Sequence, residues 1–146
     1  MAVNPKTLYD MSLFRDMDAD ALGKISLLMN YMKVQEGELL TQKGQNAHTF
    51  YVILSGNFMI SFKEDRAVTL HERGQIMGWS SVVTPFRYTG TAVALTRGEV
   101  LCLSAAAFRE LLMGDARISE LLMKKINAII AERMPYYAGR KKAVNS

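Results

Sequence analysis

Apolar residues recur three and four positions apart near the start of the chain, which is the spacing of one face of a helix. Asp18 stands just before this pattern, where its side chain can cap the first turn. Residues 8–17 ahead of it indicate a short helix or a turn-rich segment. We therefore predict a helical lead over residues 1–31. The apolar positions of its main helix are Leu22, Ile25, Leu28 and Met29.

The same helical spacing returns at the other end of the chain, over residues 104–135. Ser104 is a suitable N-cap for a helix over Ala105–Met113, and a glycine follows that can end it. Asp115 can cap a longer helix over Ala116–Met134. The sequence therefore predicts two C-terminal helices, the second of them long.

The longer helix carries more large aliphatic side chains than one packed face requires. Part of this stripe should cover the rest of the domain, and the remainder would lie in water on a monomer. We therefore expect a homodimer through Ala116–Met134. Pro135 should end the helix, and residues 136–146 should form an unordered tail. The stripe consists of Ile118, Leu121, Leu122, Ile126, Ile129 and Ile130.

Between the helical ends, over residues 32–103, the pattern changes to short apolar or alternating segments. Turn residues separate them about every eight to twelve positions, which is typical of a β-sandwich or barrel. There are about eight such segments, enough for an antiparallel double-stranded β-helix, or jelly roll. Phe50–Leu54 and Phe58–Phe62 form the clearest pair, with Gly56 and Asn57 between them. We expect these two strands to be adjacent and antiparallel, joined as a hairpin.

The composition is that of one soluble domain. Of the 146 residues, 49% are hydrophobic and 22% charged, so residues 1–146 can form a single domain with a substantial core. No segment approaches the roughly 18 apolar residues needed to span a bilayer. Met1–Ser12 lacks a signal-peptide pattern, and we expect a cytoplasmic protein with no membrane partner. The one cysteine, Cys102, lies in an apolar segment and should be a buried, inert thiol.

Positive charge gathers towards the C-terminus. Residues 116–146 carry seven Lys and Arg side chains against two glutamates, a net charge of +5, while the whole chain carries +4. A basic C-terminus could contact nucleic acid or an anionic surface. We favour the alternative of a solvated helix face followed by an unordered tail.

Little in the sequence points to catalysis. His48 and His71 are the only histidines, and neither has cysteine or acidic neighbours at metal-ligand spacing. No serine has a His–Asp arrangement that the sequence can support. We therefore expect no enzyme activity and no metal, and we interpret both histidines as surface residues.

Residues 74–92 carry the most distinctive candidate site. A short apolar strand, Ile76-Met77, leads into Gly78, which lets the backbone adopt a positive φ or approach a ligand closely. The amides that follow can point together as an anion-binding nest, beside two serine hydroxyls. Arg87 at the far rim offers a charged fork suited to phosphate or carboxylate. The plain alternative is a surface loop that carries an arginine.

This stretch resembles the phosphate-binding cassette of the cyclic-nucleotide-binding domain family. Met77-Gly78 matches the opening of the cassette and Ser81-Val82 matches its middle. The family's ribose-binding glutamate falls on Trp79. The family's phosphate-binding arginine falls on Arg87 if the loop is one residue short, and on Tyr88 in an alignment without a gap. We assign it to Arg87, because this role requires a cation.

A second stretch, from Gly44 to Gly56, resembles the family's other signature. Its polar, small and apolar positions match, and only Thr41 ahead of it departs from an aliphatic preference. The resemblance extends from about Leu13 to about Met134, and it implies a catabolite-activator-like sensor domain whose long C-terminal helix responds to ligand. Only about a dozen residues follow Met134, fewer than the helix-turn-helix module of the family's transcription factors requires.

The resemblance implies a ligand-responsive regulatory domain that acts on a downstream protein. Its ligand would be cAMP or cGMP, bound weakly because Trp79 replaces the acid, or another anionic small molecule. The alternative is a degenerate domain that binds no nucleotide and serves as a dimeric protein-interaction module. The ligand-binding residues that we expect are Gly78, Trp79, Ser80, Ser81, Arg87, Tyr88 and Thr89.

The side chain of Trp79 bears directly on these two alternatives. Its indole could fill the space of the ribose, stack on a ligand of different shape, or turn into the β-roll as part of the core. The sequence leaves these three placements open.

Overall fold

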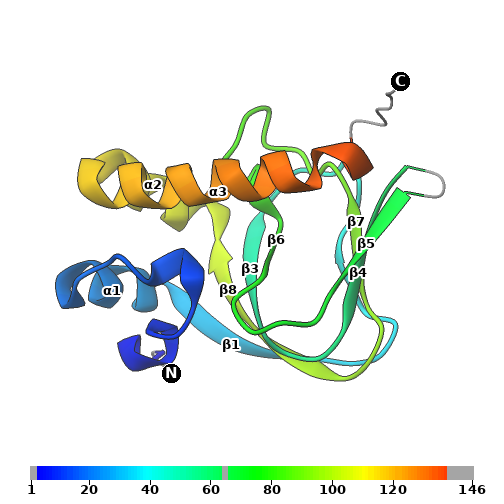
Figure 1. Ribbon diagram of the computed structural model, residues 1–146, viewed down its shortest axis with the longest axis horizontal. Coiled ribbons are helices and arrows are strands. Elements are labelled where there is room, and N and C mark those ends of the chain that lie inside the picture. The colour runs from blue at the N-terminus through cyan, green and yellow to red at the C-terminus, as the bar shows by residue number, and fades with distance from the viewer. Residues whose placement is uncertain (1–2, 64–65, 138–146) are drawn as a thin grey trace.

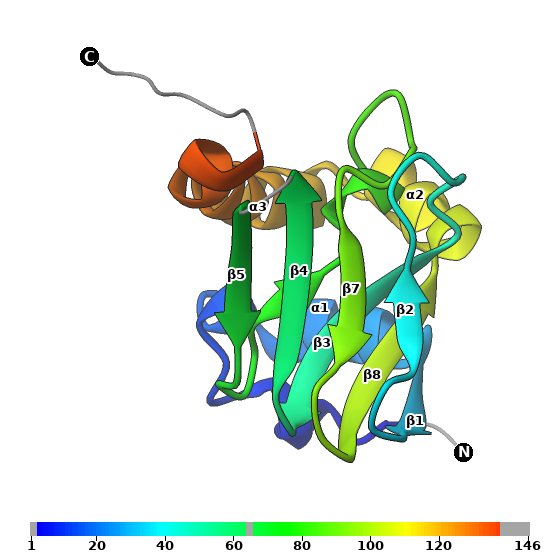
Figure 2. The same cartoon turned by 90° about the vertical axis from the view of Figure 1, so that its right-hand side faces the viewer.

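The computed structural model describes residues 3–63 and 66–137, and these contain two four-stranded sheets and flanking helices (Figure 1). The strands are β1 (Met29–Val34), β2 (Leu39–Thr41), β3 (Thr49–Ser55), β4 (Phe58–Lys63), β5 (Arg66–Leu70), β6 (Ile76–Met77), β7 (Thr91–Ala94) and β8 (Gly98–Ser104). One sheet has the order β1-β8-β3-β6 and the other β2-β7-β4-β5, with every pairing antiparallel. Figure 2 shows the second sheet in front of the first. The predicted jelly roll is confirmed.

Helical segments lie at both ends of the chain and in the cassette. They are the 3-10 helices η1 (Pro5–Leu8), η2 (Ser12–Phe14) and η3 (Trp79–Ser81) and the α-helices α1 (Ala19–Ser26), α2 (Ala105–Gly114) and α3 (Ala116–Tyr137). The long C-terminal helix α3 lies across the end of the β-roll, above the N-terminal segments in Figure 1. The predicted flanking helices and long C-terminal helix are confirmed.

The predicted hairpin between residues 50–54 and 58–62 is wrong. β3 pairs with β6 and β8 whereas β4 pairs with β5 and β7, so the two strands lie in different sheets. Gly56 turns the chain from one sheet to the other at a φ of 100°. A Cβ there would lie 2.9 Å from the Arg97 carbonyl oxygen, because the β7–β8 turn packs directly against it. Gly56 therefore serves a contact between two corners of the roll rather than a hairpin.

The N-terminal α-helix is shorter than its apolar spacing indicated. Asp18 caps α1 as expected, accepting a hydrogen bond from the Ala21 amide at 2.9 Å. The helix ends at Ser26, however, and β1 begins at Met29 rather than at residue 32. Met29 lies opposite Leu103 of β8 and is buried there. Strand pairing therefore overrides the helical spacing of the last apolar positions.

Both predicted caps of the C-terminal helices are present. The Ser104 hydroxyl accepts a hydrogen bond from the Ala107 amide at 3.3 Å. The Asp115 carboxylate accepts one from the Ile118 amide at 3.1 Å. Each cap satisfies one of the amides that a helix leaves open in its first turn.

The end predicted for the long helix is wrong, because α3 continues through Pro135 to Tyr137. A proline in a helix removes one backbone donor but not the acceptor on its own carbonyl. Arg66 of β5 donates to that carbonyl at 3.2 Å and thereby ties the last turn to the β-roll. The rest of the predicted tail, residues 138–146, lies outside the described residues.

The apolar stripe of α3 packs mainly within the chain, against β4, β5 and η2. Its fully buried members are Ile118, Leu122 and Ile126, and its half-buried members are Leu121, Ile129 and Ile130. The rest of the domain therefore covers part of the stripe, as expected, and the homodimer stays a prediction.

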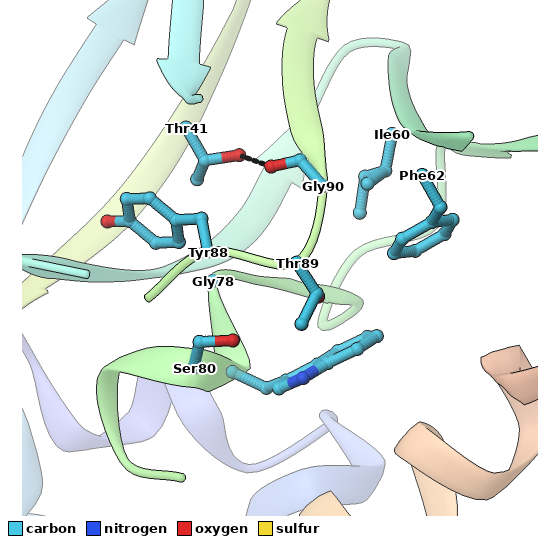
Figure 3. Close-up of a pocket in the computed structure, with 9 residues that line it drawn as sticks. Thr41, Ile60, Phe62, Gly78, Ser80, Tyr88, Thr89 and Gly90 are labelled. Carbon is cyan, nitrogen blue, oxygen red and sulfur yellow. Dashed lines mark hydrogen bonds between the residues drawn. The ribbon is translucent and has the colours of Figure 1, made fainter. Parts of the chain in front are cut away.

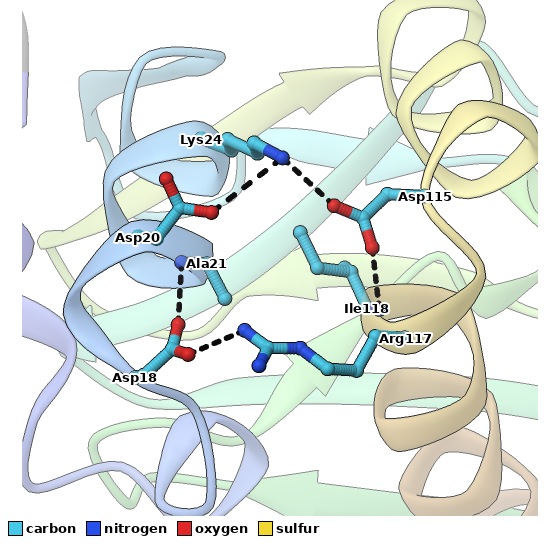
Figure 4. Close-up of polar contacts among 7 residues, drawn as sticks. All are labelled: Asp18, Asp20, Ala21, Lys24, Asp115, Arg117 and Ile118. Atoms are coloured by element: carbon cyan, nitrogen blue, oxygen red, sulfur yellow. Dashed lines mark hydrogen bonds and ion pairs between the residues drawn. The ribbon is translucent and has the colours of Figure 1, made fainter.

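Charged side chains join α1 to the first turn of α3 (Figure 4). Lys24 Nζ lies 2.9 Å from an Asp115 carboxylate oxygen, and Arg117 donates to Asp18. The hydrogen bond from the Ala21 amide, followed by that from Arg117, lowers the pKa of Asp18. The hydrogen bond from Lys24 lowers the pKa of Asp115. Because these groups are exposed or, for Asp115, half-buried at the surface, each pair adds little to stability, but together they set α1 against the base of α3.

The two histidines and the cysteine differ in their exposure. His48 and His71 are exposed, as expected. Cys102 is half-buried, and its burial raises the pKa of the thiol. Within residues 3–63 and 66–137, no group of three or more His, Cys, Asp or Glu side chains is placed to hold a metal ion. The helices in the same residues are too short or too polar to cross a membrane.

Candidate ligand site

The two sequence motifs meet in space. The Gly44 amide donates to the Tyr88 carbonyl at 2.9 Å, and the Tyr88 amide donates to the Gln45 carbonyl at 3.0 Å. One residue pair further along, the Ala47 amide donates to the Phe86 carbonyl at 2.8 Å. These bonds join the loop of the upstream motif to the far arm of the cassette. The candidate site therefore lies between the two stretches that the sequence singled out.

Gly78 sets the entry of the cassette. Its φ of 82° lies in the left-handed region, and it carries the chain from β6 into η3. A Cβ at this position would lie 2.7 Å from the Thr49 carbonyl oxygen, so no other residue fits without a backbone shift. Ser81 then donates to the Gly78 carbonyl through both its amide, at 3.1 Å, and its hydroxyl, at 2.8 Å. The turn is therefore closed by its own atoms.

The cavity within the cassette is very small. Its volume is about 10 Å³, which is close to the space of one water molecule. Figure 3 shows the side chains around it. The cavity is lined by Thr41, Ile60, Phe62, Gly78, Trp79, Ser80, Tyr88, Thr89 and Gly90. Five of the seven expected ligand-binding residues are in this lining, and Ser81 and Arg87 are not.

Trp79 fills the space beside the cavity. Its side chain is 5% exposed and stacks on Phe62 of β4, with ring centroids 5.9 Å apart and planes 22° apart. On α3, the Arg133 guanidinium carbon lies 5.6 Å from the centroid of the indole. Trp79 is therefore a core residue held between the β-roll and the C-terminal helix.

Arg133 is a site residue that the sequence analysis missed. It is 5% exposed, and its Nη1 donates to the Ile76 carbonyl at 2.8 Å. Burial lowers the pKa of Arg133 to about 10, with Glu132 acting in the opposite direction. A signal was present, because Arg133 follows Ile126 and Ile130 at helical spacing and so lies on the buried stripe of α3.

Tyr88 and Arg87 lie on opposite sides of the cassette arm. The Tyr88 hydroxyl donates to the Thr49 carbonyl at 2.8 Å and accepts from the Thr49 amide at 3.0 Å, and burial raises the pKa of the phenol. The Arg87 side chain is exposed and donates to the Gly44 carbonyl at 3.2 Å. The inward position of the arm thus holds a neutral phenol that is already fully hydrogen-bonded.

Few polar groups around the cavity are free to meet a ligand. Thr41, absent from the predicted site, donates to the Gly90 carbonyl and accepts from the Ala92 amide, both at 2.9 Å (Figure 3). The Ser80 hydroxyl is buried and makes no hydrogen bond to any described residue. Thr89 is half-buried beside it. Among the side chains of the lining, the donors that remain are neutral hydroxyls, which suit a small polar group better than a nucleotide.

The outer loop of the cassette rests on α2. Phe86 has a φ of 63°, and the Arg109 guanidinium carbon of α2 lies 4.3 Å from the centroid of its ring. This contact stabilises the loop against the helix that precedes α3. The cassette is thus connected to both C-terminal helices, through Phe86 and through Trp79.

Similarity to known proteins supports the interpretation of the motifs. A model of the cyclic nucleotide-binding domain family matches residues 31–115, more than half of the 146-residue chain. The chain is also 22% identical over 111 residues to a cAMP-dependent protein kinase type II regulatory subunit of Drosophila melanogaster, covering 76% of this chain and 29% of that protein. It therefore spans less than a third of the length of the curated relatives that it matches.

Solved structures resemble the chain over most of its length. A protein from Geobacter metallireducens, described as a cyclic nucleotide-binding protein, superimposes with a TM-score of 0.82 at 22% identity, covering 90% of this chain and 98% of that one. The regulatory subunit of a cAMP-independent protein kinase A from Trypanosoma brucei gives a TM-score of 0.77 at 12% identity, covering 92% and 47%. At these identities the structures establish a shared fold, and the match over residues 31–115 establishes the family. The chain belongs to the cyclic nucleotide-binding domain family.

Proposed function

We propose that this chain is a regulatory domain in which Trp79 takes the place of the ribose and phosphate of a cyclic nucleotide. One observation carries the proposal: the indole is held between Phe62 of the β-roll and Arg133 of α3. A ligand that closed the cassette would bridge the same two parts of the fold. Here a side chain of the chain itself makes that bridge, so α3 is docked on the roll without a nucleotide.

Three features weaken cAMP and cGMP binding in this arrangement. The cavity of about 10 Å³ has no room for a ribose unless Trp79 moves. Trp79 also removes a charge-assisted hydrogen bond to the ribose, a type worth about 1.5–3 kcal/mol, or roughly ten- to a hundred-fold in affinity. Tyr88 presents a neutral, already bonded hydroxyl where a phosphate needs a cation.

Another anionic ligand remains part of the proposal for the same site. Ser80 would offer its free hydroxyl, and Thr89 lies next to it. Arg87 would supply the charge, for which its side chain must leave the Gly44 carbonyl and turn over the rim. Binding would displace Trp79 from Arg133 and so release α3, because a ligand shifts an equilibrium only through its different affinity for the two states.

Similar proteins support a domain of this kind without fixing its ligand. The Drosophila relative is named as cAMP-dependent, whereas the Trypanosoma regulatory subunit is named as cAMP-independent. Both share the family fold with this chain. The filled cassette favours cAMP-independent behaviour for this chain.

A second candidate function is a dimeric interaction module that binds no small molecule. The observation that favours it is also the filled cavity, because a site without space needs no ligand. The half-buried Leu121, Ile129 and Ile130 of α3 would form the dimer interface. Sedimentation at micromolar concentration tests this candidate: it requires a dimer that Ile129→Glu dissociates.

Calorimetry with cAMP and with cGMP tests the proposed function. We expect no binding of either nucleotide to the wild type at micromolar concentration. Trp79→Glu should restore the ribose contact and improve cAMP affinity by about ten- to a hundred-fold. Trp79→Phe is the matched control, because it keeps an aromatic ring and adds no acid.

Two double variants then locate the cation. If Arg87 holds the phosphate, Trp79→Glu combined with Arg87→Ala should lose the regained affinity. If Tyr88 marks the arginine position, Trp79→Glu combined with Tyr88→Arg should bind more tightly than Trp79→Glu alone. Micromolar binding of cAMP by the wild type would contradict the proposed function whatever the variants do.

A further inference from the structure

A second and larger hollow lies beneath α3, away from the cassette cavity. Its volume is about 380 Å³, and its walls come from the N-terminal segment around η2, the loop between β5 and β6, and the last turns of α3. Three arginines contribute to these walls: Arg15, Arg73 and Arg133. We call this hollow, defined by those three residues, the Arg133 cleft.

Arg133 is the buried cation of the cleft. Only 5% of the residue is exposed, and its one hydrogen bond to a described residue goes to the Ile76 carbonyl. No carboxylate among the described residues lies within ion-pair distance of it. A guanidinium has five N–H donors, so most of its donors are without an acceptor in residues 3–63 and 66–137. Arginine is almost never buried to this extent unless it is paired, because desolvating an unpaired charge is unfavourable.

The other charges of the cleft compensate this cation only in part, through Glu132. Arg73 is occupied, since its Nε lies 3.1 Å from Asp10 and its Nη2 donates to the Thr7 carbonyl. Arg15 is exposed and makes no ion pair with a described residue. Glu72 and Glu132 also line the cleft, but both are exposed, where water and salt screen their charges. The floor of the cleft is therefore positive and its rim is mixed.

From this arrangement we infer that the Arg133 cleft binds an oxyanion, the phosphate or carboxylate group of a small molecule. The group would accept two hydrogen bonds from the guanidinium of Arg133, and Arg15 would close over it from the mouth. Planar two-point contact of this kind is what arginine offers to carboxylate and phosphate. A volume of about 380 Å³ accommodates a small metabolite around that group.

An anion in the cleft would also act on the cassette. Arg133 faces the indole of Trp79 on one side and the cleft on the other. Binding would draw the guanidinium towards the anion and change the surroundings of Trp79. This inference does not rest on the proposed function, because the cleft shares no lining residue with the cassette cavity.

Thermal unfolding of the intact chain tests the inference, with inorganic phosphate as the probe and sodium chloride at equal ionic strength as the reference. For millimolar affinity, about 20 mM phosphate should raise Tm by roughly 2–5 °C over the chloride reference. Sodium acetate forms a second arm that tests the carboxylate source. A specific shift with either anion supports the site and identifies the group that it prefers.

Three single variants separate the site from a general salt effect. Arg133→Gln should abolish the phosphate-specific shift, and Arg15→Gln, which changes an exposed side chain, should reduce it. Arg97→Gln is the matched control, because Arg97 is an exposed arginine on the distant β7–β8 turn, and its phosphate shift should equal that of the wild type. If Arg133→Gln does not fold, Arg15→Gln decides. Equal shifts in phosphate, acetate and chloride, or a full phosphate shift in Arg15→Gln, would overturn the inference.

Discussion

The cassette cavity and the Arg133 cleft lie on either side of the same pair of side chains, Trp79 and Arg133, and they differ in almost every respect. The cavity has a volume of about 10 Å³, and the side chains that line it are uncharged. The cleft holds about 380 Å³ and has three arginines in its walls. Trp79 lines the cavity, Arg133 lines the cleft, and the two side chains contact each other between them.

This difference shows that a sequence motif predicts the backbone course of a site without predicting which side chains fill it. The cassette begins with Gly78 in the left-handed region, and η3 follows it. Its interior, however, is filled by packed side chains, among them Trp79 and Phe62. The guanidinium that could hold an anion is that of Arg133, which lies next to Trp79 on α3 and outside both sequence motifs.

The largest effect on stability should come from a change in the packed cassette. Trp79→Ala would leave an empty space between Phe62 and Arg133, and we expect it to reduce the free energy of unfolding by about 3–5 kcal/mol. Chemical denaturation followed by circular dichroism measures this loss. Leu39→Ala is the control, because Leu39 is 55% exposed and should cost far less. A loss below about 1 kcal/mol would show that Trp79 is not a core residue.

A smaller effect should come from the charged side. Arg133→Met removes the guanidinium but keeps much of the side-chain volume. We expect the free energy of unfolding in phosphate-free buffer to change by less than about 1 kcal/mol, because the lost hydrogen bond and ring contact are offset by removal of a buried charge. Ile126→Ala, on the same face of α3, should cost about 2–5 kcal/mol. An equally large loss for Arg133→Met would mean that the arginine stabilises the domain without an anion.

The smallest effect should come from the exposed charges between α1 and α3. The pKa of Asp115 is lower in the folded state than its ordinary value of 3.8, because Lys24 donates to it. Its contribution to stability is therefore present above pH 3.8 and is lost as the pH falls through the lower folded pKa. Asp115→Asn keeps the helix cap and should flatten the fall in stability between about pH 5 and pH 2.

Lys24→Met offers the matching test, since it removes the partner and should flatten the same part of the profile. Urea unfolding at several pH values measures both variants. If Asp115→Asn falls as steeply with acid as the wild type, the pair is not formed in solution.

The sequence predicts the helix N-caps correctly but not the turn at Gly56, and the reason is the distance along the chain over which each is determined. Asp18, Ser104 and Asp115 each accept from an amide three residues away, so local rules place them correctly. The hairpin expected at Gly56 is wrong. Two consecutive apolar strands have the same sequence pattern whether they pair within one sheet or belong to two sheets. Only the packing of Gly56 against the β7–β8 turn distinguishes these cases.

The candidate site was predictable to the same extent. Gly78 and the neighbouring positions follow from the motif, because backbone geometry is what the motif encodes. The inward turn of Tyr88 depends on its bonds to Thr49 of β3, far away in the sequence. Arg133 lies at a helical position that looks like any surface arginine until the stripe around it is seen to be buried.

The fluorescence of Trp79 tests the central claim most directly, because it is the one tryptophan of the chain and reports on the cassette alone. Emission and acrylamide quenching would be followed while cAMP is added up to millimolar concentration. If Trp79 occupies the nucleotide position, the indole should be protected from quencher at the outset, and micromolar cAMP should change neither signal. A saturable change at micromolar cAMP, or an indole that acrylamide reaches freely without ligand, would contradict the account.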